Sequence, residues 1–261
     1  MSRWEQGKLH LELLGAQREI AFPYALGEAT ALDIIPTARA LSEGITAVSV
    51  EHTLAEGFSI TCGPGCGACC RQLVPIAPLE ASALSALVAA LPEPRQSELR
   101  ARFALAVERL EQVGLLDVAS ARGRGALLRE AESDEGDWQN VSRRYYALGI
   151  ACPFLEHESC SIYAQRPLIC REYQVVTPAS YCQTLDARTQ AIPWYVRMSE
   201  VLADLGGTLT QASSASIPFV LALEFAEVHG AAFLASVDGE TLAQCLLDKI
   251  AAHSEQPAPL R

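Results

Sequence analysis

Nine of the 261 residues are cysteines, and four of these fall within nine consecutive positions. The four are separated by little besides Gly, Pro and Ala: they are Cys62, Cys66, Cys69 and Cys70. A loop so rich in glycine folds tightly enough to point several thiols at one place. Thiolates are soft ligands, and sets of them favour Zn²⁺, Cu(I) or iron–sulfur clusters over Mg²⁺ or Ca²⁺. The stretch therefore predicts a metal-binding loop.

A second set of cysteines lies far downstream and lacks the tight spacing of a zinc ribbon: Cys152, Cys160, Cys170 and Cys182. The fold must therefore bring these side chains together. Four plus four sulfurs would complete two tetrahedral sites, or would bind one cluster with thiols to spare. We predict that all eight cysteines are metal ligands, and that the metal is either Zn²⁺ or iron in an iron–sulfur cluster.

The residues beside the cysteines bear on how such a centre is built. Cys69 and Cys70 are neighbours, and successive side chains usually diverge. Either they serve different centres, or one is a ligand and the other a supporting or redox thiol. An all-cysteine site is strongly anionic, because each ligand must be deprotonated. Arg71, Arg166 and Arg171 are predicted to compensate that charge by donating to sulfur; ordinary surface ion pairs are the competing interpretation.

The two cysteine segments resemble the CxxCxxCC signature of the YkgJ-type cysteine-cluster family. The first block is Cys62-x3-Cys66-x2-Cys69-Cys70-Arg71, followed by Pro75, Pro78 and Glu80. The second block comprises Cys152-Pro-Phe-Leu, Cys160-Ser-Ile-Tyr and Arg166-Pro-Leu-Ile-Cys-Arg-Glu-Tyr173. The resemblance covers residues 58 to 182 and implies a zinc- or iron-chelating domain. One departure is the three-residue gap between Cys62 and Cys66, where the family label has two.

Two other interpretations of the cysteines are weaker. The spacing Cys-x3-Cys-x2-Cys also occurs in radical S-adenosylmethionine enzymes, but Ala68 stands where those proteins usually have an aromatic residue. The alternation of strands and helices that a barrel requires is also missing. A disulfide framework is favoured neither by the size of the chain nor by any export signal.

Cys245 lies on an apolar helical face and is predicted to be a buried, inert thiol. His157 is predicted to be a solvated loop residue, with a ligand or proton-carrier role as the alternative.

Composition restricts the partners. The chain has 20 Lys and Arg against 31 Asp and Glu, a formal net charge of -11, so it would repel phosphate backbones and nucleic acid is not an expected partner. The first residues carry charges where a signal peptide would be apolar. The longest apolar stretch, Ile217 to Ala235, contains Glu224 and His229 and does not suit a lipid bilayer. We therefore expect a cytoplasmic protein whose identifiable partner is a metal ion.

Hydrophobic spacing, prolines and capping residues predict a mainly α fold, with a small N-terminal β hairpin and irregular cysteine-rich metal-binding loops. The hairpin is expected within Leu9–Leu26, with its turn near Gly15. Segment 117–136 is predicted to be a solvated loop, and 194–205 is compatible with strand or helix. Helices are expected near 36–57, 79–91, 94–114, 137–149 (capped by Asp137), 218–228 and from Asp238 onward. The expected domains are an N-terminal hairpin and helix (1–57), a cysteine-cluster metal-binding domain (58–182) and a mostly helical C-terminal region packed on it (183–261).

Three functional hypotheses remain open. In the first, metal joins the two cysteine segments and fixes the fold. In the second, an iron–sulfur centre serves an enzyme that modifies a protein or a small molecule. A distant branch of the family resembles flagellin lysine N-methylases, but we find no separate methyltransferase domain and no catalytic residue to name. In the third, the protein delivers metal to a partner, which would require labile sites.

Overall fold

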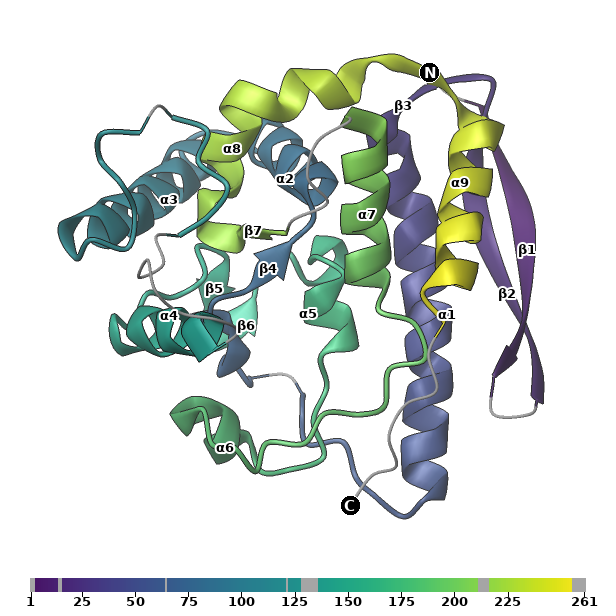
Figure 1. The fold of residues 1–261 in the computed structure, drawn as a ribbon, viewed down its shortest axis with the longest axis horizontal. Coiled ribbons are helices and arrows are strands. Elements are labelled where there is room, and N and C mark those ends of the chain that lie inside the picture. The colour runs from purple at the N-terminus through teal and green to yellow at the C-terminus, as the bar shows by residue number, and fades with distance from the viewer. Residues whose placement is uncertain are drawn as a thin grey trace.

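The computed structural model describes residues 3–13, 16–63, 65–120, 122–127, 136–210 and 216–254. Over these residues the fold is mainly α, with a β hairpin near the N-terminus and irregular loops around the cysteines, as predicted. Figure 1 shows the hairpin on the outside of α1 (Ile34–Ala55) and α9 (Gly239–Ala252). No helix in the described ranges is both long and apolar enough to cross a membrane.

The N-terminal hairpin is longer than predicted, because its first strand begins at Arg3 rather than near Leu9. Strand β1 (Arg3–Leu13) pairs antiparallel with β2 (Ala16–Leu26). The first residues of β1 are mostly exposed, so they lack the alternation of apolar and polar side chains that identifies a strand in sequence. The predicted turn residue Gly15 lies outside the described residues.

Helix α1 runs directly to the first cysteine loop. Leu41, Ile45 and Val48 recur at helical spacing in its sequence, and all three are buried. The helix packs on β2 at Gly44, where a Cβ would lie 2.5 Å from the Ile20 side chain, so the close approach requires glycine. It ends before Gly57, whose φ of +86° confirms this glycine as the predicted stop.

The other predicted helices are present, with boundaries close to those expected. They are α2 (Pro78–Ala89), α3 (Arg95–Gln112), α4 (Gly136–Ala147), α8 (Ala222–His229) and α9. The segment 194–205, whose sequence is compatible with strand or helix, is helical from Met198 onward, in α7 (Met198–Thr210). Asp238 caps α9, since its Oδ1 accepts a hydrogen bond from Thr241 N at 2.8 Å. The predicted cap of α4, Asp137, has a side chain outside the described residues. Phe219, Ala222, Phe225 and Val228 recur at helical spacing in the sequence, which predicts one apolar face for α8; that prediction is wrong at Val228, which is 50 % exposed.

Shorter elements connect these helices. Two are α-helical, α5 (Ile169–Glu172) and α6 (Ala179–Thr184). Three small antiparallel pairs are formed by β3 (Glu28–Thr30) with β8 (Ser236–Asp238), β4 (Pro75–Ile76) with β7 (Ile217–Pro218), and β5 (Leu155–Glu156) with β6 (Ser159–Cys160). The 3₁₀ turns are Ala31–Asp33, Cys69–Arg71, Tyr163–Gln165, Phe219–Leu221 and Gly230–Leu234.

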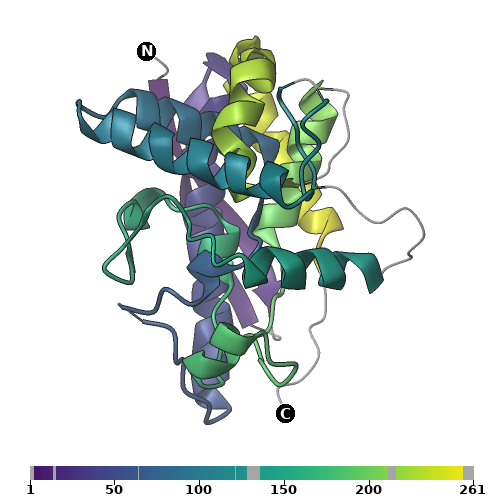
Figure 2. The same ribbon diagram turned by 90° about the vertical axis from the view of Figure 1, so that its left-hand side faces the viewer.

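The largest hydrophobic core joins the two ends of the chain. It contains buried side chains from β2, α1, α7 and α9, among them Phe22, Leu202 and Leu246. A second core lies between α2, α3 and the second cysteine segment, around Phe103, Phe154 and Phe219. Figure 2 shows α3 and α4 one above the other, with the β5–β6 hairpin to one side. The second cysteine segment therefore packs directly against the helical core, through Cys152 and Cys160.

The segment after α3 is not the solvated loop that we predicted, at least over 122–127. Arg124 is partly buried, with its side chain 11 % exposed, and pairs with buried Glu224 of α8 through Nε at 2.7 Å and Nη2 at 2.8 Å. Arg124 Nη1 also bonds Glu111 at 2.7 Å. Leu127 is buried. A largely buried ion pair with this many hydrogen bonds fixes the segment against α8.

Candidate metal centre

The first cysteine loop leaves α1 as irregular chain and closes in the 3₁₀ turn Cys69–Arg71. Its backbone folds back on itself, with Cys66 N donating to Gly63 O at 3.1 Å and Cys70 N donating to Gly67 O at 3.2 Å. Gly65 has a φ of +85°, which glycine adopts without strain. The described residues thus form the tight turn that the glycines predict.

The second cysteine segment begins with the β5–β6 hairpin, which lies against the first loop. Its two-residue turn places His157 and Glu158 at φ values of 48° and 58°, a conformation that costs non-glycine residues free energy. Glu158 accepts hydrogen bonds from both Arg71 Nη atoms, at 2.9 and 2.5 Å. A Cβ at Gly67 would lie 2.5 Å from Glu158 Oε2, so any larger residue there would make the Glu158 side chain shift.

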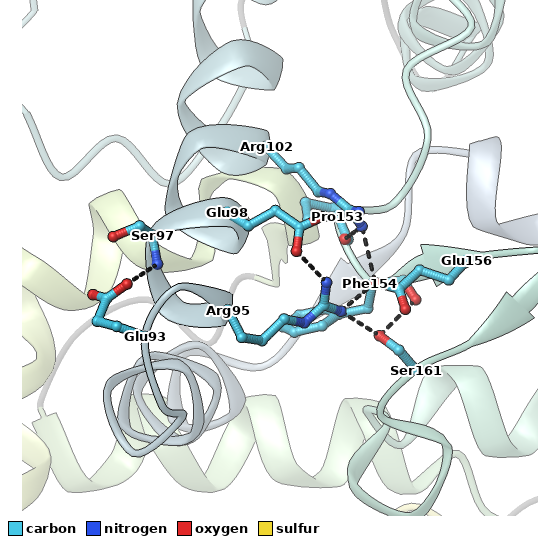
Figure 3. A network of polar contacts seen from close by, with 9 residues as sticks. All are labelled: Glu93, Arg95, Ser97, Glu98, Arg102, Pro153, Phe154, Glu156 and Ser161. Carbon is cyan, nitrogen blue, oxygen red and sulfur yellow. Dashed lines mark hydrogen bonds and ion pairs between the residues drawn. The ribbon is translucent and has the colours of Figure 1, made fainter.

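The positions of Cys152 and Cys160 are fixed from two sides. On one side, Cys152 N donates to Cys70 O at 2.6 Å and joins the two cysteine segments. On the other, Figure 3 shows Arg95 and Arg102 of α3 converging on Glu156 of the hairpin. Arg102 also donates to the carbonyl oxygen of Pro153 at 2.9 Å (Figure 3). The hairpin is therefore held between α3 and the first cysteine loop.

Cys170 lies on α5, whose start is held by a buried carboxylate. Glu80 is 5 % exposed, and its oxygens accept hydrogen bonds from Leu168 N at 2.7 Å and Ala77 N at 3.0 Å. Burial raises the pKa of Glu80, and the two N–H donors and Arg39 oppose that rise. Glu80 therefore fixes the start of α5 relative to the start of α2.

A second buried carboxylate holds the other end of α5. Glu172 accepts a hydrogen bond from Ser199 N at 2.8 Å, and burial raises its pKa to about 8. The sequence placed Glu80 at the start of a helix, but it predicted neither the burial of these carboxylates nor their contacts around α5, because hydrophobic spacing carries no signal for a buried glutamate. For Glu80 a local signal exists. It stands three residues after Ala77 in the first turn of a helix, where a carboxylate can cap backbone N–H groups.

The remaining cysteines, Cys62, Cys66 and Cys182, pack together around a small cluster whose buried members are Ala68, Val175 and Cys182. Val175 N donates to Cys62 Sγ at 3.3 Å. Thr61 N donates to Val175 O at 2.9 Å, which ties the first loop to the chain between α5 and α6.

The nine cysteines, all within the described residues, are free thiols. Cys69 lies close enough to interact electrostatically with six of the other seven predicted ligands: Cys62, Cys70, Cys152, Cys160, Cys170 and Cys182. Cys66 interacts with Cys62 and Cys182. The fold thus brings the two cysteine segments together. Within the described ranges, no three His, Cys, Asp or Glu side chains already stand in the arrangement that holds a metal ion.

The environments of these thiols differ. Burial raises the pKa of Cys152 to about 12, and it raises the pKa of Cys170 well above its usual value. The pKa of Cys69 falls to about 7, chiefly because the Cys70 thiol donates a hydrogen bond to it, with Arg166 acting in the same direction. The same hydrogen bond, together with burial, raises the pKa of Cys70. One thiolate is thus stabilised at the point where the two segments meet.

The three predicted arginines lie near the thiols in different ways. Arg166 interacts electrostatically with Cys62, Cys69 and Cys160. It stacks on Tyr163, with Cζ 3.9 Å from the ring centroid, and its Nε is buried with no hydrogen-bond partner among the described residues. Arg171 donates to the carbonyl oxygens of Arg166 and Ala164. Arg71 forms an ion pair with Glu158 and also interacts electrostatically with Cys70.

Two other sequence predictions can be placed. His157 is exposed at the tip of the hairpin, as predicted for a solvated histidine. Cys245 is partly buried and packs against the largest core, away from the other eight cysteines.

A comparison with protein families gives one match. Residues 61–194, just over half of the chain, match the CxxCxxCC family model, described as "Putative zinc- or iron-chelating domain". Neither the curated proteins nor the solved structures gave a match. The matched span contains all eight clustered cysteines and both segments that the fold brings together. The chain therefore belongs to the CxxCxxCC family.

Proposed function

We propose that this protein binds zinc or iron through its eight clustered cysteines, and that the metal holds the two cysteine segments together. The observation that carries the proposal is the meeting of thiols from segments distant in sequence, beside a guanidinium whose Nε is buried without a partner in the described residues. A buried donor without an acceptor costs free energy. A thiolate of Cys62, Cys69 or Cys160 would supply an acceptor for Arg166.

The donor set fits the metals that the family description names. Sulfur ligands suit zinc and iron, and eight of them complete two tetrahedral sites. Bound metal would replace the thiol protons and cross-link the loops, which contributes ~10–16 kcal/mol in small zinc peptides. Since no three donors are prearranged in the described residues, the side chains must turn inward on binding. Arg166 and Arg171 would then offset part of the thiolate charge.

Metal analysis of anaerobically purified protein tests the proposal. We expect bound zinc, or bound iron with visible absorption if the metal is in a cluster. The variant Cys170→Ser should lose metal and unfold at a lower temperature. Cys245→Ser is the matched control and should keep both its metal and its melting temperature. The proposal is wrong if the protein holds no metal after zinc and iron are supplied, or if Cys170→Ser keeps the full metal content.

A further inference from the structure

The eight clustered cysteines divide into two groups by what surrounds them. We call Cys70, Cys152, Cys160 and Cys170 the inner group. Of these, Cys152 and Cys160 pack against the core around Phe154, and Cys152 N is bonded to Cys70 O. We call Cys62, Cys66 and Cys182 the outer group, which packs around Ala68 and Val175. Figure 1 shows the loop after α1, together with α6, below α5 and the β5–β6 hairpin.

Electrostatic contacts follow the same division. Cys170 interacts with Cys152 and Cys160, and Cys70 interacts with Cys152 and Cys170. In the outer group, Cys182 interacts with Cys62 and Cys66. Cys69 interacts with members of both groups and neighbours Cys70 in the chain. Adding Cys69 to the outer group gives four donors on each side, the number that a tetrahedral site needs.

The two groups are not held equally firmly. Three members of the inner group lie on well-supported chain: Cys160 is on the hairpin attached to α3, Cys152 directly precedes that hairpin, and Cys170 is on α5, which two buried carboxylates fix at its ends. The fourth, Cys70, lies in the 3₁₀ turn that closes the first loop and is tied to this chain through the hydrogen bond from Cys152 N to its carbonyl oxygen. The outer group stands on the irregular loop 58–68 and on the six-residue helix α6, around a cluster with three buried members. Donors that the surrounding structure holds in place bind metal with less loss of conformational entropy.

We propose that the eight cysteines form two adjacent but unequal metal sites. The inner site, Cys70, Cys152, Cys160 and Cys170, holds one ion tightly. The outer site, Cys62, Cys66, Cys69 and Cys182, holds a second ion that is released first. This inference rests on the proposed function, since it assigns the ligands of the same centre. It makes the outer ion the exchangeable one, on the part of the centre formed by loops.

Zinc release measures the difference directly. Protein saturated with Zn²⁺ is mixed with a chromophoric chelator, and the zinc transferred is followed over time. We expect about two equivalents of bound zinc, with one released at least on the order of tenfold faster than the other, a difference of about 1.4 kcal/mol in activation free energy. Cys182→Ser should remove the fast phase and keep the slow one. Cys245→Ser should show both phases.

A second measurement avoids the risk that a variant fails to fold. Wild-type protein that has lost only its fast-released zinc is treated with an alkylating agent and digested, and the modified cysteines are identified by mass spectrometry. We expect modification of Cys62, Cys66 and Cys182, with Cys152, Cys160 and Cys170 protected. A single equivalent of zinc, two equivalents released together, or first modification of the inner cysteines would each overturn the inference while leaving metal binding intact. A protein that binds no zinc or iron would instead refute the proposed function.

Discussion

The inner and outer groups both consist of cysteine thiols, and they differ in how firmly the surrounding structure holds those side chains. Cys170 stands on a helix whose start Glu80 bonds, and Cys152 stands beside a fully buried Phe154. Cys62 and Cys66 stand on a loop whose turn depends on Gly65 and on a few backbone hydrogen bonds. If both groups bind metal as proposed, this comparison leads us to expect that the affinity of each site depends on the packing behind its ligands as well as on the ligands.

Among the supporting residues, Arg124 is expected to have the largest effect on stability, and it belongs to neither cysteine group. Replacing it therefore tests whether the difference in zinc binding between the inner and outer groups has a local cause. Arg124→Ala would leave buried Glu224 without its partner, which costs about 3–5 kcal/mol in comparable pairs. Urea unfolding measures this loss. Both zinc sites should remain in the folded variant. If one group lost its zinc selectively, the difference between the groups would depend on overall stability rather than on local support.

The same ion pair gives a pH dependence with a defined sign. Hydrogen bonds from Arg124 lower the pKa of Glu224 in the folded state, against the effect of burial. A lowered folded-state pKa contributes stability above the unfolded value, and that stability is lost as the pH falls through the folded value. The free-energy difference between wild type and Arg124→Ala, measured by urea unfolding, should therefore shrink in acid. A difference that grew toward low pH would contradict this assignment.

Glu80→Ala should separate the inner group from its support. The substitution leaves the buried N–H groups of Leu168 and Ala77 without acceptors, for an expected loss of about 2–4 kcal/mol. Glu80→Gln keeps one oxygen acceptor and should lose less. In chelator experiments, Glu80→Ala should speed release of the slow zinc and leave the fast phase unchanged. Faster release of the outer ion alone would reverse the comparison.

Gly67→Ala tests the contact between the first loop and the hairpin. The added Cβ would lie 2.5 Å from Glu158 Oε2 and 2.9 Å from Leu155 Cδ1. Both atoms end flexible side chains, so we expect a loss of ~1 kcal/mol, at the low end of overpacking costs. Thermal unfolding measures it. Gly63→Ala is the matched control, because nothing lies within 4 Å of its added Cβ; an equal loss in both variants would argue against the contact.

The smallest effect is expected from Arg71→Ala. Arg71 and Glu158 form an ion pair in which both side chains are at least one-third exposed, at 36 % and 51 %. Such pairs contribute less than about 1 kcal/mol and are screened by salt. The melting temperature should fall slightly at low ionic strength and hardly at all in high salt. A large loss that persists in salt would show that Arg71 supports the centre in another way.

Local patterns predicted the elements that positioned the site and left their mutual contacts undetermined. The stripe Leu99, Phe103 and Leu110 in α3 is buried as its spacing predicts. In contrast, β4 pairs with β7 across more than a hundred residues, and no local periodicity encodes that pairing. The Arg124–Glu224 pair was not predicted for the same reason. A charged residue in a polar segment is expected to be exposed to solvent unless its partner elsewhere in the chain is known.

For the candidate metal centre, the sequence identified which residues take part but not how they are arranged in space. Cysteine spacing identified the two segments and gave the family resemblance. It could not show that Cys69 lies between two groups of thiols, because that placement depends on how α5 and the hairpin pack against the first loop. Nor could it show that Arg71 is engaged by Glu158, since the two residues are 87 positions apart.

The turn at His157 and Glu158 has one further consequence. Two consecutive non-glycine residues in left-handed backbone conformations store about 1–3 kcal/mol each. A two-residue hairpin turn of this type requires positive φ at both of its central residues, so this energy is recovered only when the pairing of β5 with β6 is lost. Unpairing the hairpin that carries Cys160 therefore costs less free energy than its broken contacts alone suggest.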